Sequence, residues 1–371
     1  MKKIIYVTYQ TFPAETANSL QTISNIKYLV RNKIDVELMF PLRDKESNSN
    51  LETIKKYYSI NENFKVTGIK HFLPFGKINI FKSFIFNLSH FIWSWYVVNF
   101  KIKKNSDVSF ITRSDWILYF LAKKGNHVLF ECHQISRTRN YVINKVFNFS
   151  NVKIVFLNHN LQKFYDLDDQ QSTVLHNGVD EDLFDTTTRN MNRDLGRMIF
   201  VGNLKRFNNE RGLKFLIDAF NTRDYLLKYK LSIIGGPESY ADELRKHVAA
   251  LNLEKNIEIL GRVERSNISK IYQNAHIGIL INTSTDDHSY KYTSPLKYFE
   301  YIYAGLNVIA VDFPSHRELP GSSNVIYFEE NNTASFELAL RKAISFVPDN
   351  TNLLKHITLD NRAKLLIDLI S

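Results

Sequence analysis

The stretch from Tyr292 to Asp312 reads YTSPLKYFEYIYAGLNVIAVD, and it joins a helix start, a helix end and an apolar strand in direct succession. Ser294 is a natural N-cap and Pro295 a natural first helical residue, so a helix is expected to begin there. Gly305 is expected to end it, because glycine tolerates the left-handed backbone that closes many helices. The apolar run that follows predicts a strand buried on both faces, as in parallel sheets that helices cover.

The same alternation of short apolar runs with longer helical patterns extends outward from this stretch in both directions. The chain has 371 residues. Single cores stop growing at about 300 residues, so two doubly wound α/β domains are expected. We expect a Rossmann-like domain over 1–185, a second over 186–350, and a C-terminal helix over 351–371 that packs on the first domain. Ligands usually bind at the carboxyl ends of parallel strands, so a cleft between the domains is the expected site.

The individual elements follow from hydrophobic periodicity. In the first series we expect strands over 3–8, 35–40, 66–70, 108–112, 127–131, 154–157 and 173–175, with helices over 18–33 and 114–124. In the second we expect strands over 198–201, 230–234, 257–260, 277–281, 307–310 and 324–327, with helices over 211–220, 239–251, 267–273, 295–304, 333–346 and 356–370.

The composition is that of an ordinary globular protein, with 44% hydrophobic and 23% charged residues. A single cysteine, Cys132, excludes an internal disulfide framework and fits a reducing compartment. Lys and Arg number 48 against 38 Asp and Glu, and the net charge of +10 favours anionic partners such as nucleotide diphosphates or phospholipid headgroups. The basic residues are dispersed and lack a nucleic-acid-binding motif, so no nucleic acid is expected as a partner.

The predicted helix at Ser294 suggests a binding function as well as a fold. Unpaired backbone N–H groups at a helix start can hold a phosphate, so Ser294, Pro295, Leu296 and Lys297 are candidates for anion binding. Glu300 lies about one and a half turns further in. A carboxylate so placed can accept hydrogen bonds from both hydroxyls of a ribose, although an ordinary solvated helix glutamate is the alternative.

This stretch resembles the donor-site motif of the GT-B glycosyltransferases of family 4, the glycosyl transferases group 1. In that family two glutamates lie eight positions apart around a phosphate-binding turn and helix, and the second binds the nucleotide ribose. Glu300 matches the second glutamate, whereas Tyr292 stands where the family has the first, which contacts the donor sugar. The variant SPLKxFEY is familiar from members that build bacterial surface polysaccharides, so the resemblance still implies an active transferase.

The resemblance extends over nearly the whole chain. HNGVD at 176–180 resembles the family's interdomain signature, and FVGNL at 200–204 followed by ERG at 210–212 resembles its strand, glycine turn and basic residue. The family usually has an arginine after the first glycine and a lysine before the second, both facing the diphosphate. Here Asn203 and Arg211 take those places. Arg211 is therefore the expected phosphate ligand, with an ordinary surface arginine as the alternative, and Lys205 and Arg206 are weaker candidates.

Other residues that match the family lie at the ends of further predicted strands. Gly202 belongs to the first glycine turn, Gly235 and Gly236 match the turn beside the nucleotide, and Arg262 and Val263 match the segment whose backbone meets the base. FECH at 130–133 matches a strand ending in Glu-x-His, which implies that His133 lies near the donor sugar; a structural histidine is the alternative. Arg113 matches an arginine often found in the family, and the loop 11–18 resembles its acceptor side.

The resemblance implies a retaining enzyme that moves a sugar from a nucleotide-diphosphate sugar to a glycan or lipid-linked glycan acceptor in polysaccharide biosynthesis. It implies no cofactor and no metal, with His133, Arg211 and Glu300 as the principal site residues. Catalysis would consist of positioning and charge stabilisation. Two other readings stay open: a nucleotide-sugar 2-epimerase on the same fold, and a non-catalytic GT-B scaffold subunit.

Residues 72–104 suggest a different kind of contact, because aromatic side chains are interleaved there with lysines. The aromatic residues are Phe72, Phe75, Phe81, Phe84, Phe86, Phe91, Trp93, Trp95, Tyr96 and Phe100. Such a segment suits an interfacial helix on anionic lipid, whereas the alternative is a long core helix with lysines on its wet side. No apolar run has the length of a membrane span or a signal sequence. The expected location is the cytoplasm, with peripheral contact to the inner face of the cell membrane under the first reading.

Overall fold

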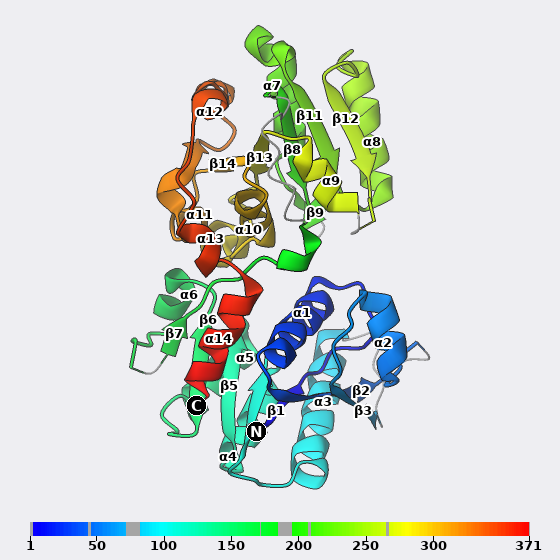
Figure 1. Cartoon of the computed structure of the whole chain (residues 1–371), viewed down its shortest axis with the longest axis vertical. Coiled ribbons are helices and arrows are strands. Elements are labelled where there is room, and N and C mark those ends of the chain that lie inside the picture. The colour runs from blue at the N-terminus through cyan, green and yellow to red at the C-terminus, as the bar shows by residue number, and fades with distance from the viewer. Residues whose placement is uncertain are drawn as a thin grey trace. The chain divides into compact units, whose positions relative to one another are not determined.

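The computed structural model describes residues 3–43, 46–71, 82–170, 172–184, 195–206, 209–264 and 267–370. The chain forms two compact units (Figure 1). Unit 1 comprises Met1–Leu175 together with Leu359–Ser371, and unit 2 comprises His176–Thr358. Both are α/β units built on parallel sheets, as the alternation of elements predicted.

The described part of unit 1 contains a seven-stranded parallel sheet in the order β3-β2-β1-β4-β5-β6-β7. Its strands are β1 (Lys3–Val7), β2 (Asp35–Leu42), β3 (Lys65–Lys70), β4 (Val108–Thr112), β5 (His127–Cys132), β6 (Val152–Phe156) and β7 (Ser172–Val174). Its helices are α1 (Ala17–Arg31), α2 (Leu51–Tyr58), α3 (Lys82–Tyr96), α4 (Asp115–Lys123), α5 (Arg137–Val146), α6 (His159–Phe164) and α14 (Leu359–Leu369). The strand order reverses between β1 and β4, the switch point at which doubly wound sheets bind ligands.

The described part of unit 2 repeats this plan with a six-stranded parallel sheet in the order β12-β11-β8-β13-β14-β15. Its strands are β8 (Arg197–Val201), β11 (Lys230–Ile234), β12 (Ile257–Gly261), β13 (Ile277–Leu280), β14 (Asn307–Val311) and β15 (Val325–Phe328). A short antiparallel hairpin, β9 (Lys205–Arg206) with β10 (Asn209–Glu210), follows β8. Its helices are α7 (Leu213–Thr222), α8 (Glu238–Ala250), α9 (Ile268–Gln273), α10 (Leu296–Tyr303), α11 (Pro314–Arg317), α12 (Thr333–Ser345) and α13 (Leu353–His356).

The division between the units differs from the expected one. The expected boundary at 185/186 falls within 185–194, outside the described residues. The described residues 176–184 belong to unit 2, because Val179 and Phe184 pack in its core and Val179 pairs with Thr358. The C-terminal segment divides as well: the chain up to Thr358 lies with unit 2, whereas α14 lies with unit 1.

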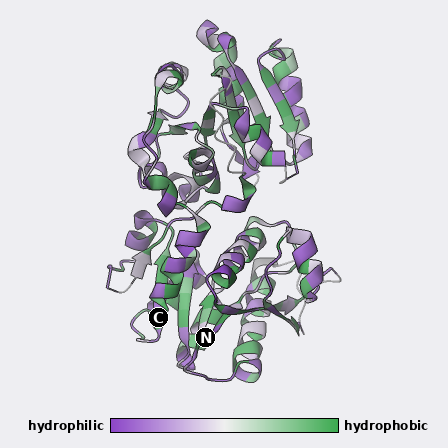
Figure 2. Cartoon of the chain, in the orientation of Figure 1, coloured by the Kyte–Doolittle hydropathy of each residue, from purple (hydrophilic) through white to green (hydrophobic). Residues whose placement is uncertain are grey.

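Apolar strands form the core of each unit. In unit 1, α14 adds Leu359, Ala363 and Leu366 to a core shared with α1, β1 and β2. Helices α1 and α14 therefore lie against each other on the sheet. Hydropathy separates buried from exposed elements (Figure 2): the strands are mostly green, α8 is largely purple, and α3 is mostly green although it lies on the outside of the sheet.

The segment 72–104 combines features of the two alternatives, an interfacial helix on lipid and a core helix. Residues 72–81, with Phe72, Phe75 and Phe81, lie outside the described part. The rest forms α3 and a π-helical turn, η1 (Val97–Lys101). Trp93 and Val97 are buried in unit 1, whereas Phe84 and Trp95 are exposed. The described helices include none that is long and apolar enough to cross a membrane.

Candidate functional site

Three turns at the carboxyl ends of β8, β11 and β12 are joined backbone to backbone. Gly202 donates from its N–H to the Ile234 carbonyl at 3.0 Å, and Gly235 donates to the Gly261 carbonyl at 2.7 Å. Gly235 has φ +148°, and a Cβ there would lie 1.7 Å from the Gly202 oxygen. Only glycine permits this approach. The predicted glycines Gly202, Gly235 and Gly236 thus form one edge of unit 2.

Arg211 lies at the same edge with its guanidinium held by two acceptors. Nε donates to Oδ1 of Asn282 at 2.6 Å, and Nη1 donates to the Asn203 carbonyl at 2.8 Å. The guanidinium also stacks over the Phe200 ring, 5.4 Å from its centroid. Asn282 is buried and follows β13. Because β8 and β13 flank the point where the strand order reverses, Arg211 is fixed at the switch point of the sheet.

Within the described residues Arg211 forms no ion pair, so no carboxylate there balances its charge. Burial, together with the nearby charge of Arg206, lowers the pKa of Arg211 to about 10. Arg206 itself lies 3.8 Å from Asp286, measured from Nε to Oδ2. The cationic side of this edge therefore favours an anion, because a bound anion would relieve both the burial cost and the repulsion between the arginines.

Glu300 is buried in the second turn of α10 and accepts two hydrogen bonds on one oxygen. Tyr272 donates to Oε2 at 2.5 Å, and Lys297 donates from Nζ to the same oxygen at 2.6 Å. Burial and the adjacent carboxylate raise the pKa of Tyr272 well above its usual value, so its hydroxyl stays protonated and donates. The solvated helix glutamate of the alternative reading is therefore wrong for Glu300, which is 9% exposed. Within the described residues both hydrogen bonds fall on Oε2, so Oε1 is the oxygen that can accept from another donor.

The start of α10 differs from the prediction in one respect. Helix α10 begins at Leu296, with Pro295 at the N-cap and no side chain capping it. The expected N-cap, Ser294, is engaged elsewhere: its hydroxyl accepts from the Asn177 N–H at 3.2 Å, while the Asn177 side chain donates to the Ser294 carbonyl at 2.6 Å. These two hydrogen bonds connect the turn at 177–178 to the segment before α10. Ser294 therefore contributes to tertiary packing rather than to helix capping.

The other predicted donor-site residues also lie in unit 2. Lys205 lies over the Tyr240 ring, with Nζ 4.3 Å from its centroid. Arg262 is exposed beside Gly236, and Val263 packs against the core of unit 2. Tyr292 is partly buried and ends a π-helical turn, η6 (His288–Tyr292), just before α10.

Unit 1 has its own polar cluster at the carboxyl ends of β4 and β5, centred on the fully buried Glu131. Tyr6 and Arg113 donate to its Oε2 at 2.7 and 3.1 Å, and Arg362 donates to its Oε1 at 2.6 Å. Burial alone would raise the pKa of Glu131, but the two arginines hold it well below the usual range. Arg113, the expected family arginine, is thus a partner of Glu131 from the neighbouring strand.

His133 follows β5 directly and lies 3.9 Å from Glu131, between Nε2 and Oε1. Burial, with the charges of Arg113 and Arg362, lowers the pKa of His133 to about 3, so the imidazole is neutral near pH 7. Its Nε2 is buried and makes no hydrogen bond within the described residues. A neutral, partly exposed imidazole at a sheet's carboxyl edge can accept from or donate to a ligand hydroxyl.

A second group in unit 1 centres on Tyr9, which precedes the loop 11–18 expected to face the acceptor. The Tyr9 hydroxyl lies 2.7 Å from Nε2 of His71 and 2.8 Å from the Ser89 hydroxyl. The His90 ring stacks on Tyr9 with centroids 4.4 Å apart, and the Arg43 guanidinium lies 4.8 Å from the same ring. The sequence pattern does not reveal this cluster, because its members are brought together from α3 and from the segments that follow β1, β2 and β3.

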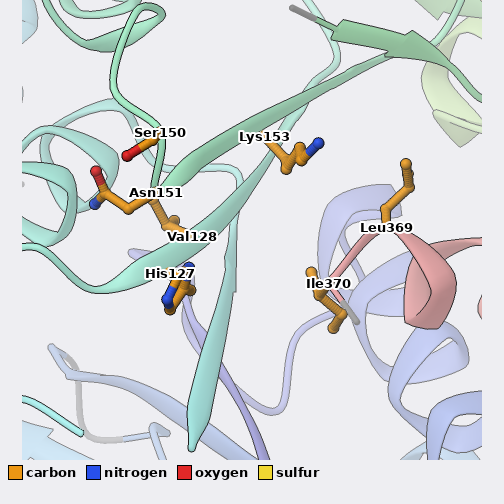
Figure 3. Close-up of a pocket in the computed structure, with 7 residues that line it drawn as sticks. All are labelled: His127, Val128, Ser150, Asn151, Lys153, Leu369 and Ile370. Atoms are coloured by element: carbon orange, nitrogen blue, oxygen red, sulfur yellow. The ribbon is translucent and has the colours of Figure 1, made fainter. Parts of the chain in front are cut away.

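A pocket in unit 1 lies near the amino ends of β5 and β6 (Figure 3). His127 and Val128 begin β5, and Lys153 lies near the start of β6. Leu369 and Ile370 form the opposite wall (Figure 3). Doubly wound sheets bind ligands at the carboxyl ends of their strands, so this pocket is not the candidate site. The described residues do not bring three His, Cys, Asp or Glu side chains together as a metal site would require.

Comparison with known proteins accounts for the arrangement in unit 2. Residues 196–345 match the family described as glycosyl transferases group 1. Unit 2 is therefore similar to this family over most of its length. This match includes Arg211, Glu300 and the three joined glycine turns. No curated protein sequence matches the chain.

Solved structures of low sequence identity share the fold over the full length. A sucrose-phosphate synthase from Thermosynechococcus elongatus superposes with a TM-score of 0.66 at 14% identity, covering 100% of this chain and 95% of that one. The lipopolysaccharide outer core galactosyltransferase WaaB gives 0.67 at 15% identity, with 99% of both chains covered. HepE from Anabaena in complex with UDP-glucose gives 0.60 at 14% identity, covering 99% and 94%. At these identities the likeness establishes the GT-B fold.

Asn282, Tyr272 and Asn177 are the site residues that sequence reasoning missed. A polar residue at the end of an apolar run is an available signal, because Asn282 ends the apolar run that contains β13. Tyr272 carried no such signal, because its hydroxyl reaches Glu300 across 28 positions from the preceding helix. Asn177 belongs to the HNGVD stretch that resembles the family's interdomain signature, but its bond to the segment before α10 is a tertiary contact that this stretch does not predict.

Proposed function

We propose that this protein is a retaining glycosyltransferase that takes a sugar from a nucleotide-diphosphate sugar. The observation that carries the proposal is Arg211, a cation fixed at the switch point of unit 2 by Asn282 and without a carboxylate partner in the described chain. A diphosphate supplies the missing negative charge. The UDP-glucose complex of HepE, a protein of the same fold, supports a nucleotide sugar as the ligand class.

In this proposal unit 2 holds the donor through two anchors. Arg211 binds the diphosphate and stabilises the charge that develops on it as the sugar leaves, with Lys205, Arg206 and Lys297 as the neighbouring cations. Glu300 accepts the ribose hydroxyls on Oε1, because Tyr272 and Lys297 occupy Oε2. The Gly235 and Arg262 turns lie beside the nucleotide.

Unit 1 supplies the neutral imidazole of His133, which hydrogen-bonds a hydroxyl of the transferred sugar. The buried Glu131–Arg113 pair fixes the strand end that carries it. The acceptor oxygen attacks on the face from which the diphosphate departs, through an oxocarbenium-like state, so no protein nucleophile is required. The acceptor is a glycan or a lipid-linked glycan of a surface polysaccharide, and the enzyme works without metal in the cytoplasm or at the inner face of the cell membrane.

Two other functions predict different products from the same substrate. An epimerase would change the sugar and keep it attached to the diphosphate, and a scaffold subunit would leave nucleotide sugars unchanged. We would incubate the full chain with a panel of nucleotide sugars and cell-derived glycan acceptors, then measure released nucleoside diphosphate and the anomeric configuration of the product. Release with retention supports the proposal. An epimerised donor, or no turnover with any donor, contradicts it.

A further inference from the structure

Helix α3 has an outer apolar stripe in addition to its buried face. Phe84, Leu88, Phe91 and Trp95 are spaced at i, i+4, i+7 and i+11, the spacing of one helical face. They are 67%, 45%, 37% and 45% exposed. A core helix needs only its inner face to be apolar, so packing of unit 1 does not explain the stripe.

The stripe continues past the end of α3. Phe100, in the π-helical turn η1, is 63% exposed and packs edge-on against Trp95, with centroids 5.2 Å apart. Helix α4 lies beside α3, where Phe91 meets Trp116 at 4.9 Å, and α5 lies beside α4, where Trp116 meets Tyr141 at 6.4 Å. Tyr141 is also exposed. We call this three-helix surface the aromatic face.

Lysines surround the aromatic face and are paired with its tyrosines. Lys101 lies over Tyr96, Lys123 over Tyr119 and Lys145 over Tyr141, with each ammonium 4.7 to 5.7 Å from the ring centroid. Lys103 and Lys104 follow η1 and are exposed. Amphipathic side chains of this kind, apolar along their length and polar at the tip, are typical of surfaces that meet lipid headgroups.

The distribution of acidic residues matches this arrangement. Between Glu62 and Asp166 the sequence has fifteen Lys and Arg against three acidic residues, a surplus of twelve that exceeds the whole chain's +10. Two of the three acids are neutralised inside unit 1: Asp115 pairs with Arg139, and Glu131 with Arg113 and Arg362. The outer surface is therefore cationic as well as aromatic, which complements an anionic surface.

We propose that the aromatic face docks on an anionic phospholipid bilayer, with α3 lying in the headgroup region. A second copy of this chain fits less well, because a two-fold contact would place the same lysines against each other. The helix rests on the membrane rather than crossing it. This inference stands on unit 1 alone and does not depend on the donor chemistry of unit 2.

The test is flotation of the full chain with vesicles of phosphatidylglycerol and phosphatidylcholine, against vesicles of phosphatidylcholine alone. We expect flotation only with the anionic vesicles, and loss of it as salt rises. Changing Lys101, Lys103 and Lys104 together to Gln should weaken partitioning by on the order of a hundredfold, since each surface lysine contributes roughly fivefold. The matched control changes the exposed Lys228, Lys246 and Lys255 of unit 2 to Gln and should float like wild type.

A second arm tests the apolar stripe. Phe84→Ser with Phe100→Ser should also abolish flotation, whereas Leu338→Ser with Val347→Ser, exposed apolar residues of unit 2, should not. Tryptophan emission should shift to the blue on anionic vesicles, and Trp95→Phe should reduce the shift while flotation persists, because Trp116 of the same face remains. Thermal unfolding of each variant separates lost docking from lost folding.

Three results would overturn the proposal. The first is no flotation of wild type on anionic vesicles at low salt. The second is equal loss in the unit 2 lysine control, which would indicate non-specific charge. The third is lipid-independent self-association that Phe84→Ser with Phe100→Ser abolishes, which would make a second copy the occupant of the face.

Discussion

Arg362 donates a 2.6 Å hydrogen bond through Nη2 to Oε1 of Glu131, which lies 231 positions earlier in the chain. Both side chains are buried, with 3% and 0% exposure. The bond places the last helix, α14, in the polar cluster below His133, on the sheet that the N-terminal half of the chain builds. The end of the chain therefore contributes directly to the candidate site of unit 1.

Glu131→Gln should destabilise unit 1 strongly. The substitution keeps the shape of the side chain but leaves Arg113 and Arg362 buried without their counter-charge, a change that typically costs about 3–5 kcal/mol. Chemical unfolding followed by circular dichroism measures the difference. Glu37→Gln is the matched control, because its partners Lys3 and Lys65 are more exposed. An equal, small effect of both changes would mean that the buried cluster does not stabilise unit 1.

Unit 1 should lose stability as the pH falls from about 6.5 toward 4. Burial lowers the pKa of His71 to about 4, and that of His90 and of His133 to about 3. The unfolded chain, with histidine pKa near 6.5, binds more protons in this window, so unfolding becomes easier by about 1.4 kcal/mol per pH unit for each histidine. Glu131 adds to the loss below about pH 4.3, where the unfolded carboxyl binds a proton that the folded one, with its depressed pKa, does not.

His90→Phe tests this account, because phenylalanine can keep the stacking on Tyr9 and cannot titrate. The pH dependence of the free energy of unfolding between pH 4 and 6.5 should become shallower by about 1.4 kcal/mol per pH unit. An unchanged slope would show that His90 is not held neutral in the folded state.

The sequence predicts the strands and the α/β plan well because parallel strands buried on both faces are continuous apolar runs. Strand β4 occupies the predicted 108–112, and β11 the predicted 230–234. Ser294 shows where such reasoning fails: its hydroxyl suits an N-cap, but the Asn177 N–H takes it. Local propensity cannot reveal a competing partner 117 positions away.

The same limit applies to the site. Arg211 and Glu300 were predicted from the family resemblance and lie buried or partly buried at one edge of unit 2. Their supports, Asn282 and Tyr272, are set by which strands and helices become neighbours, and the sequence pattern does not specify that pairing.

Glu300→Ala should weaken nucleotide binding by about 1–3 kcal/mol, the cost of losing charge-assisted hydrogen bonds to a ribose. Tyr272→Phe is the comparison, because it removes a donor to Oε2 and leaves Oε1 in place; its effect should be smaller. Calorimetric titration with the nucleoside diphosphate that wild type binds measures both. Wild-type affinity in Glu300→Ala would show that the ribose lies elsewhere.

Asn282→Ala should lower turnover by about tenfold to a hundredfold with little loss of stability. The asparagine positions the Arg211 guanidinium through the 2.6 Å bond to Nε, and a small displacement of a positioned group has effects of this size. Steady-state kinetics should show the loss in kcat. Asn282→Asp, which would pair with Arg211 and compete with the diphosphate, should raise KM instead; unchanged kinetics in both variants would contradict the positioning role.

The most direct test of the account is the turnover of Arg211→Ala with the nucleotide sugar that wild type uses. Loss of one donor to developing charge predicts a drop of about 10²–10³, with partial recovery in Arg211→Lys. Lys205→Ala and Arg206→Ala, measured beside it, should have smaller effects, because Lys205 lies over Tyr240 and Arg206 is near Asp286. Near-wild-type turnover in Arg211→Ala, with the loss appearing in Lys205→Ala or Arg206→Ala or in none of the three, would contradict the claim that Arg211 binds the diphosphate.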